Sequence, residues 1–190
     1  EDSKRFYNDI LARFPKNKQA LDGIKSLSGG VIGKASKVQD PDPPSEQLQP
    51  IISLYTQGHL QQALSEISQM LERFPNSAIL YNIAGSSNVG LMQLDIAINS
   101  YKQALQIRPD FAEVYRNMGD ALKLNGDLEA AIDSYKKAVL IKPDFAVAYN
   151  SMGMTLKDKG DLEGAIDSYK QAVIAEPDYG DAYHNMGVAL

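Results

Sequence analysis

The sequence contains no cysteine and no tryptophan, and only two of its 190 residues are histidine. Without cysteine the chain can form no disulfide bond, thiolate zinc site or cysteine nucleophile. His59 and His184 are far apart in the sequence, and neither has the neighbours that a zinc site or a catalytic base–nucleophile pair would require. We therefore expect no catalytic residue, no cofactor and no metal site, and hence no enzyme.

Long hydrophobic runs are also missing. No apolar segment approaches the ~20 residues of a membrane-spanning helix, so we expect no membrane insertion. The net charge is −5, and residues 44–190 carry more acidic than basic side chains. Without a stripe of Lys and Arg to neutralise phosphates, we expect no nucleic-acid partner. We expect a cytoplasmic protein, although a chain that starts at Glu1 rather than methionine has an N-terminus that looks incomplete.

What the sequence does contain is one pattern that recurs at a constant interval. The motif Tyr-x-x-Met-Gly begins at Tyr115, Tyr149 and Tyr183. A proline recurs at the same interval, at positions Pro109, Pro143 and Pro177. A period of about 34 residues predicts a repeat architecture rather than a single globular core.

Each repeat unit is predicted to be a helix–turn–helix. In residues 112–145, apolar and small side chains recur at i, i+3, i+4 and i+7, the spacing of an amphipathic helix. Gly126 suits a left-handed turn, and Asp127 can cap the second helix. We also expect Asp110 to cap the first helix. Gly119 leaves room for the two helices to approach, with Tyr135 filling the seam between them.

This order of aromatic, Met-Gly, Ala, Tyr, Ala and Pro resembles the tetratricopeptide repeat (TPR) family over residues 44–190. The resemblance implies an all-α fold, a right-handed superhelical solenoid of antiparallel helix pairs whose first helices line a concave face. We divide the array into repeats 44–77, 78–111, 112–145 and 146–179 and a partial repeat 180–190. Residues 1–27 are predicted to form a partial helical repeat, and residues 28–43 a linker or insertion. In repeat 78–111, Met92-Gln93 replaces the turn glycine.

The concave face is where the resemblance places binding. Helical geometry predicts that side chains away from the Tyr/Met/Gly stripe of each first helix face this groove. The predicted groove residues are Asn82, Arg116, Asn117, Asp120, Lys123, Asn150, Ser151, Met154, Lys157, His184 and Asn185. The same geometry adds Ile83, Ser86 and Asp181. The alternative is that these side chains form only a solvated helix face. Asparagine at equivalent sites favours binding, because its amide can serve an extended peptide backbone.

We expect a non-catalytic protein–protein interaction module that binds a peptide or protein segment in this groove. Some members of the family grip the C-terminal carboxylate of heat-shock chaperones with Lys, Asn and Arg. Asp120 and Asp181 stand where that clamp would require Asn and Lys, and their charges would repel a carboxylate.

Two alternatives remain open. The array also resembles those attached to O-linked N-acetylglucosamine transferase and to bacterial transferases, which would make it the substrate-recruiting region of a larger glycosyl- or sulfo-transferase. It could instead be a self-assembling scaffold that forms homo-oligomers through exposed repeat ends. For this alternative we expect an exposed apolar patch at the C-terminal end, made of Tyr169, Ala172 and Val173 beside Met186 and Leu190.

Overall fold

A computed structural model describes residues 42–189 of the chain. By its contacts the chain divides into residues 1–39 and residues 40–190, and the description below concerns the second unit. The predicted partial repeat at 1–27 lies outside the described residues. So does most of the predicted linker at 28–43.

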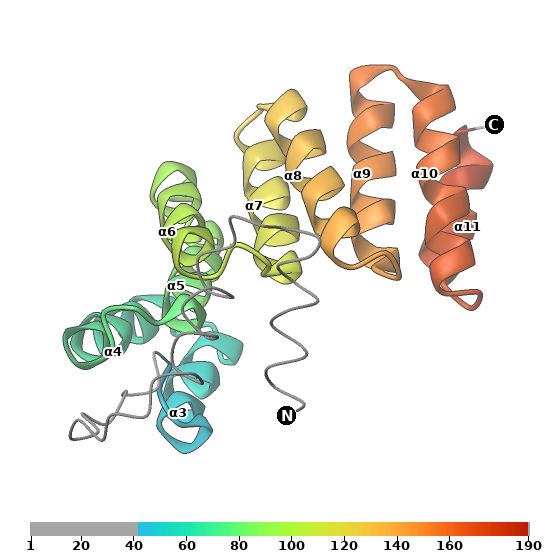
Figure 1. Cartoon of the computed structure of the whole chain (residues 1–190). Coiled ribbons are helices and arrows are strands. Elements are labelled where there is room, and N and C mark those ends of the chain that lie inside the picture. The colour runs from blue at the N-terminus through green and yellow to red at the C-terminus, as the bar shows by residue number, and fades with distance from the viewer. Residues whose placement is uncertain (1–41, 190) are drawn as a thin grey trace, which may run out of the picture. The chain divides into compact units, whose positions relative to one another are not determined.

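Residues 42–189 are all-α, as expected, and form nine helices. In chain order these are α3 (Ser45–Thr56), α4 (Leu60–Arg73), α5 (Ala78–Gly90), α6 (Leu94–Ile107), α7 (Ala112–Leu124), α8 (Leu128–Ile141), α9 (Ala146–Lys159), α10 (Leu162–Ala175) and α11 (Gly180–Ala189). They pack as adjacent pairs, α3 with α4 through α9 with α10, and α11 lies against α9 and α10 (Figure 1). Among these helices, none has the length and apolar character needed to cross a membrane.

Each well-matched pair closes around a contact between a glycine and a tyrosine. Gly119 of α7 faces the fully buried ring of Tyr135 of α8. A Cβ atom added to Gly119 would lie 2.5 Å from Cε1 of Tyr135, closer than any side chain can approach. The same 2.5 Å spacing recurs in the neighbouring pairs, between Gly85 and Tyr101 and between Gly153 and Tyr169. Glycine is therefore required where the two helices meet in these three pairs.

The turns within the pairs share a left-handed residue. Gly58, Gly126 and Gly160 have φ angles of 78°, 86° and 90°. Met92 takes the same place between α5 and α6 with φ 60°, a conformation that strains any residue with a side chain. The loss of glycine from this repeat thus changes the residue but leaves the turn in place.

The predicted caps are right at one helix and wrong at another. Asp127 caps α8, because its Oδ1 accepts a hydrogen bond from the Ala130 amide at 3.1 Å. Asp110 does not cap α7: the N-cap residue is Phe111, and no side chain caps this helix end. The carbonyl of Phe111 instead accepts from the amide of Val114 at 3.1 Å. The chain turns at Asp110, one residue too early for its carboxylate to serve as the cap.

The predicted exposed patch at the C-terminal end is wrong for two of its residues. Tyr169 and Ala172 are fully buried. Tyr169 packs in a cluster with Ala165 and Ala189, against which Met186 also lies, because α11 covers this side of α10. Leu190, the last member of the predicted patch, lies outside the described residues. The partial first helix therefore supplies the apolar partner that α10 needs.

The last two residues of the predicted linker are held against the array. Asp42 accepts a hydrogen bond from the Ser77 hydroxyl at 2.6 Å and from the Ile79 amide at 3.3 Å. It also pairs with Arg108 at the end of α6. Pro43 is buried. The chain is thus fastened to the α5–α6 pair just before α3 begins.

Candidate functional site

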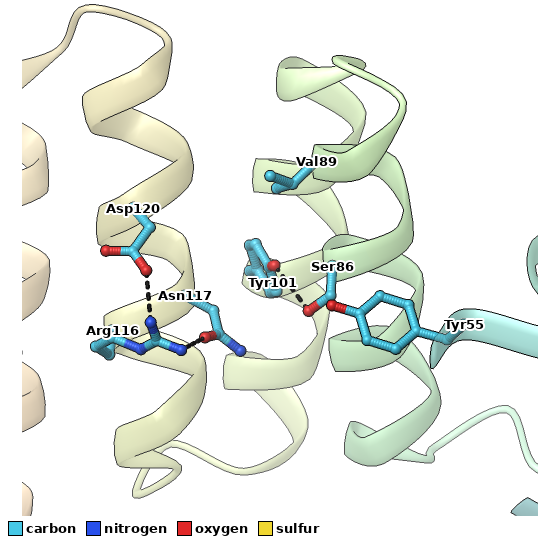
Figure 2. Close-up of a pocket in the computed structure, with 7 residues that line it drawn as sticks. All are labelled: Tyr55, Ser86, Val89, Tyr101, Arg116, Asn117 and Asp120. Atoms are coloured by element: carbon cyan, nitrogen blue, oxygen red, sulfur yellow. Dashed lines mark hydrogen bonds and ion pairs between the residues drawn. The ribbon is translucent and has the colours of Figure 1, made fainter. Parts of the chain in front are cut away.

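The first of two cavities on the array has a volume of about 170 Å³ and lies among α3, α5, α6 and α7. Tyr55 of α3 and the α7 side chains approach it from opposite sides, with Tyr101 of α6 between them (Figure 2). Seven residues line it: Tyr55, Ser86, Val89, Tyr101, Arg116, Asn117 and Asp120. We call it the Ser86 cavity.

The second cavity, of about 270 Å³, lies one repeat further along the chain. Its lining residues are Asp120, Lys123, Leu124, Tyr135, Ser151 and Met154, and we call it the Met154 cavity. All of these except Leu124 stand one repeat period after a residue that lines the first cavity. Asp120 lines both cavities. The two are therefore repeats of one site that adjoin each other.

An ion pair with further hydrogen bonds lies between the cavities. Arg116 donates from Nη1 to Asp120 Oδ2 and from Nη2 to Asn117 Oδ1, both at 2.7 Å (Figure 2). The hydroxyl of Tyr135 donates to the other oxygen of Asp120, also at 2.7 Å. The Nε of Arg116 is buried and has no hydrogen-bond partner among residues 42–189. The charge of Asp120 is thus compensated from two sides.

The buried tyrosines differ in the partners of their hydroxyl groups. Tyr101 shares a hydrogen bond of 3.1 Å with Ser86, and Tyr135 donates to Asp120. Near Tyr169, the repeat position of Ser86 and Asp120 is occupied by Met154. The hydroxyl of Tyr169 is buried without a partner in the described part of the chain. Burial raises the pKa of Tyr101 to about 12. Burial, and after it the charge of Asp120, also raises the pKa of Tyr135.

Other polar side chains connect successive first helices. The amide of Asn117 donates to Oδ1 of Asn82 at 3.0 Å, and that of Asn185 donates to Oδ1 of Asn150 at 2.9 Å. Lys123 forms an ion pair of 2.9 Å with Asp158. These contacts link α5 to α7, α7 to α9 and α9 to α11 through polar side chains.

The predicted groove residues fall into three groups. Seven line the cavities: Ser86, Arg116, Asn117, Asp120, Lys123, Ser151 and Met154. Asn82, Asn150 and Asn185 instead form the amide pairs between helices. Lys157 is partly exposed and His184 is exposed, and neither lines either cavity.

Sequence reasoning missed Tyr55 as a lining residue and assigned Tyr101 and Tyr135 only to the seam between helices. Tyr55 stands one repeat period before Val89, which in turn stands one repeat period before Lys123. The repeat period was therefore a signal that could have found Tyr55. The tyrosine rings do fill the helix seam, but each hydroxyl reaches the end of the seam that opens into a cavity.

Paired helices, a fixed glycine–tyrosine contact and a repeated cavity define a helical repeat protein. The family model described as TPR repeat matches residues 93–126, 119–158 and 153–190, which together span more than half of the chain. The chain belongs to the TPR repeat family.

Several solved structures share the fold. MamA is 23% identical with a TM-score of 0.67, and the match covers 76% of this chain and 79% of MamA. YrrB, described as a TPR protein with an unusual peptide-binding site, is 22% identical with a TM-score of 0.63, covering 77% and 76% of the two chains. The first TPR of Spaghetti (RPAP3), bound to the HSP90 peptide SRMEEVD, is 20% identical with a TM-score of 0.57, covering 59% and 89%. No protein of curated function matches the sequence.

Proposed function

We propose that this TPR array is a non-catalytic protein–protein interaction module that binds a peptide or protein segment along the first helices. The observation that carries the proposal is the pair of adjoining cavities, one repeat apart, that share Asp120. A site repeated at the period of the array suits an extended chain, whose side chains also recur at regular intervals.

The chemistry of the lining residues supports this function. Hydroxyl groups of Tyr55 and Ser86 and the amide of Asn117 line the Ser86 cavity, and all three can hydrogen-bond to a peptide. YrrB and RPAP3, which share the fold, are described with a peptide-binding site and a bound peptide respectively.

The ligand is not expected to be a chaperone C-terminus held by a carboxylate clamp. Arg116 is the basic residue of the Ser86 cavity, and it is already paired with Asp120. Asp181 lies exposed on α11, where a clamp would need a lysine. A carboxylate entering the cavity would meet a compensated arginine and a nearby negative charge.

An affinity pull-down read by mass spectrometry tests the proposal. The groove variant combines Arg116→Glu, Asn117→Ala and Met154→Ala, all of which line a cavity. The matched control carries Lys136→Glu, Gln103→Ala and Ile174→Ala on the exposed surface of second helices. Circular dichroism must show equal helicity. Partners lost only by the groove variant support binding along the first helices, whereas partners retained by both variants contradict it.

A second candidate function is the substrate-recruiting region of a larger glycosyl- or sulfo-transferase. The amide pairs Asn82–Asn117 and Asn150–Asn185 favour it, because they place asparagines in register along the first helices. Ser151 interrupts this series between them. In that case the captured partners would be acceptor substrates, modified when a full-length transferase and its donor are supplied. Partners that stay unmodified would favour a simple adaptor.

A third candidate is a self-assembling scaffold. Helix α11 carries two large exposed side chains, Tyr183 at 49% and Val188 at 60% of their full exposure. Apolar side chains of this kind favour association with a second surface. Analytical ultracentrifugation over a hundredfold concentration range tests it: a mass that rises with concentration supports self-association, and a constant monomer mass contradicts it.

A further inference from the structure

The two cavities share a framework but differ in the chemistry of their walls. The Ser86 cavity is lined by Tyr55, Ser86, Tyr101 and Asn117, whose hydroxyl and amide groups keep hydrogen-bonding capacity beyond the bonds that they already make. In the Met154 cavity the position equivalent to Asp120 is Met154, and Leu124 adds a second apolar side chain that is 57% exposed. The first cavity therefore offers hydrogen bonds, and the second offers apolar contact.

The charged groups that line the cavities are already paired. Arg116 bonds to Asp120 at 2.7 Å, and Lys123 bonds to Asp158 at 2.9 Å. A charged ligand side chain would have to compete with one of these ion pairs or approach a like charge. A neutral ligand side chain does not have to break either ion pair. The charge arrangement thus selects uncharged side chains in both cavities.

We propose that the groove recognises two uncharged side chains of one extended peptide. A hydrogen-bonding side chain such as Ser, Thr, Asn or Gln occupies the Ser86 cavity, and an unbranched or γ-branched apolar side chain such as Met or Leu occupies the Met154 cavity. This inference rests on the proposed function and names the class of ligand that it would take. The residue that sets the difference is Met154, which replaces the carboxylate of the preceding repeat.

The spacing of the two ligand residues follows from helix packing. Packed helices lie about 8–10 Å apart. A peptide in the polyproline II conformation rises about 3.1 Å per residue with three residues per turn. Residues i and i+3 of such a peptide are therefore about 9 Å apart and point to the same side. We expect the polar and apolar ligand residues to be separated by two others.

The test uses synthetic peptides of the form Ala-X-Z-X-X-Z-X-Ala, where X is a mixture and each Z is Ser, Gln, Leu, Met, Glu or Lys. The immobilised peptides are probed with the wild-type chain. Peptides with one polar and one apolar Z should bind about tenfold better than peptides with two charged Z residues. The diagnostic variant is Met154→Ser, which gives this position the side chain of Ser86. Leu140→Ser is the matched control, because Leu140 is 81% exposed on α8.

In Met154→Ser we expect the preference for Leu or Met to fall about tenfold and that for a polar side chain at the other Z to persist. The converse variant, Ser86→Met, should shift the first position towards apolar residues. Peptide binding with preferences that neither variant alters, or a preference for charged residues, overturns the inference and leaves the proposed function standing. If the wild-type chain binds the peptides no more strongly than the groove variant (Arg116→Glu, Asn117→Ala and Met154→Ala) does, the proposed function is overturned as well.

Discussion

The helix pairs α7–α8 and α9–α10 have the same packing contacts but different side chains at the cavities. In both, a glycine of the first helix lies on the ring of a buried tyrosine, and an aspartate caps the second helix. They differ at the cavity positions. Asp120 in the first pair corresponds to Met154 in the second, and Arg116 corresponds to Asn150.

This difference shows that packing and recognition are carried by separate residues. The glycine–tyrosine contact lies between the helices of a pair, so it constrains the backbone in every well-matched repeat. Asp120 and Met154 stand one residue after these glycines, and the helix pair forms with either side chain at this cavity position. The cost of the change appears at one atom, the hydroxyl of Tyr169, which is buried without a partner within residues 42–189.

The largest expected effect tests what the two pairs share. Gly119→Leu and Gly153→Leu should each lower the free energy of unfolding by about 3 kcal/mol, because the new side chain must displace a buried tyrosine ring. Urea denaturation followed by circular dichroism measures this. Gly187→Ala is the control: it occupies the equivalent position of α11, but a Cβ there meets nothing within 4 Å. An unchanged urea denaturation curve for Gly119→Leu would refute the assigned helix seam.

The next prediction tests where the two pairs differ. Tyr135→Phe removes a hydroxyl that donates to Asp120 at 2.7 Å and should cost about 1.5–2 kcal/mol, as expected for a hydrogen bond to a charged group. Tyr169→Phe removes a buried hydroxyl that lacks a partner among residues 42–189 and should leave stability unchanged or increase it. The same denaturation experiment measures both variants. Equal losses of stability in the two variants would contradict this assignment, because the Tyr169 hydroxyl would then have a hydrogen-bond partner of its own.

Alkaline pH provides a third test, with a smaller effect. An unfolded tyrosine ionises near pH 10, and burial raises the pKa of Tyr101 to about 12 in the folded chain. Between these values the unfolded state loses a proton that the folded state keeps, so stability should fall as pH rises from 10 to 12. It should not change for this reason below pH 10. Tyr101→Phe should flatten the profile measured by urea denaturation, and an unchanged slope would contradict the assignment.

The smallest expected effect concerns the turn between α5 and α6. Met92 holds a left-handed backbone with φ 60°, where the later turns have Gly126 and Gly160. Met92→Gly should stabilise the chain by about 0.5–1 kcal/mol, because relief of the strain outweighs the entropy that glycine loses on folding. Thermal denaturation compares it with Gly126→Ala, which should be destabilising. A loss of stability in Met92→Gly would show that the methionine side chain makes a contact worth more than the strain.

Much of the site could be located from the sequence and little of its bonding could. Helical geometry placed Arg116, Asp120 and Met154 on one face, and the structure finds all three at the cavities. It did not foresee that Arg116 bonds to Asp120, nor that Asn117 bonds to Asn82. Spacing along a helix gives the face on which a side chain lies, but its rotamer and its partner on the next helix depend on the distance between the two helices.

The sequence by itself determined the repeat, the pairing of helices and the glycine–tyrosine contact. Each repeat packs mainly on its neighbours, so the residues that make these short-range contacts recur once in every repeat period. Tertiary structure alone decided three other features. The partial helix α11 buries Tyr169, Asp42 fastens the chain to Ser77, and the two cavities meet at Asp120. These depend on how residues from different repeats meet in space, and no periodic pattern within one repeat specifies that.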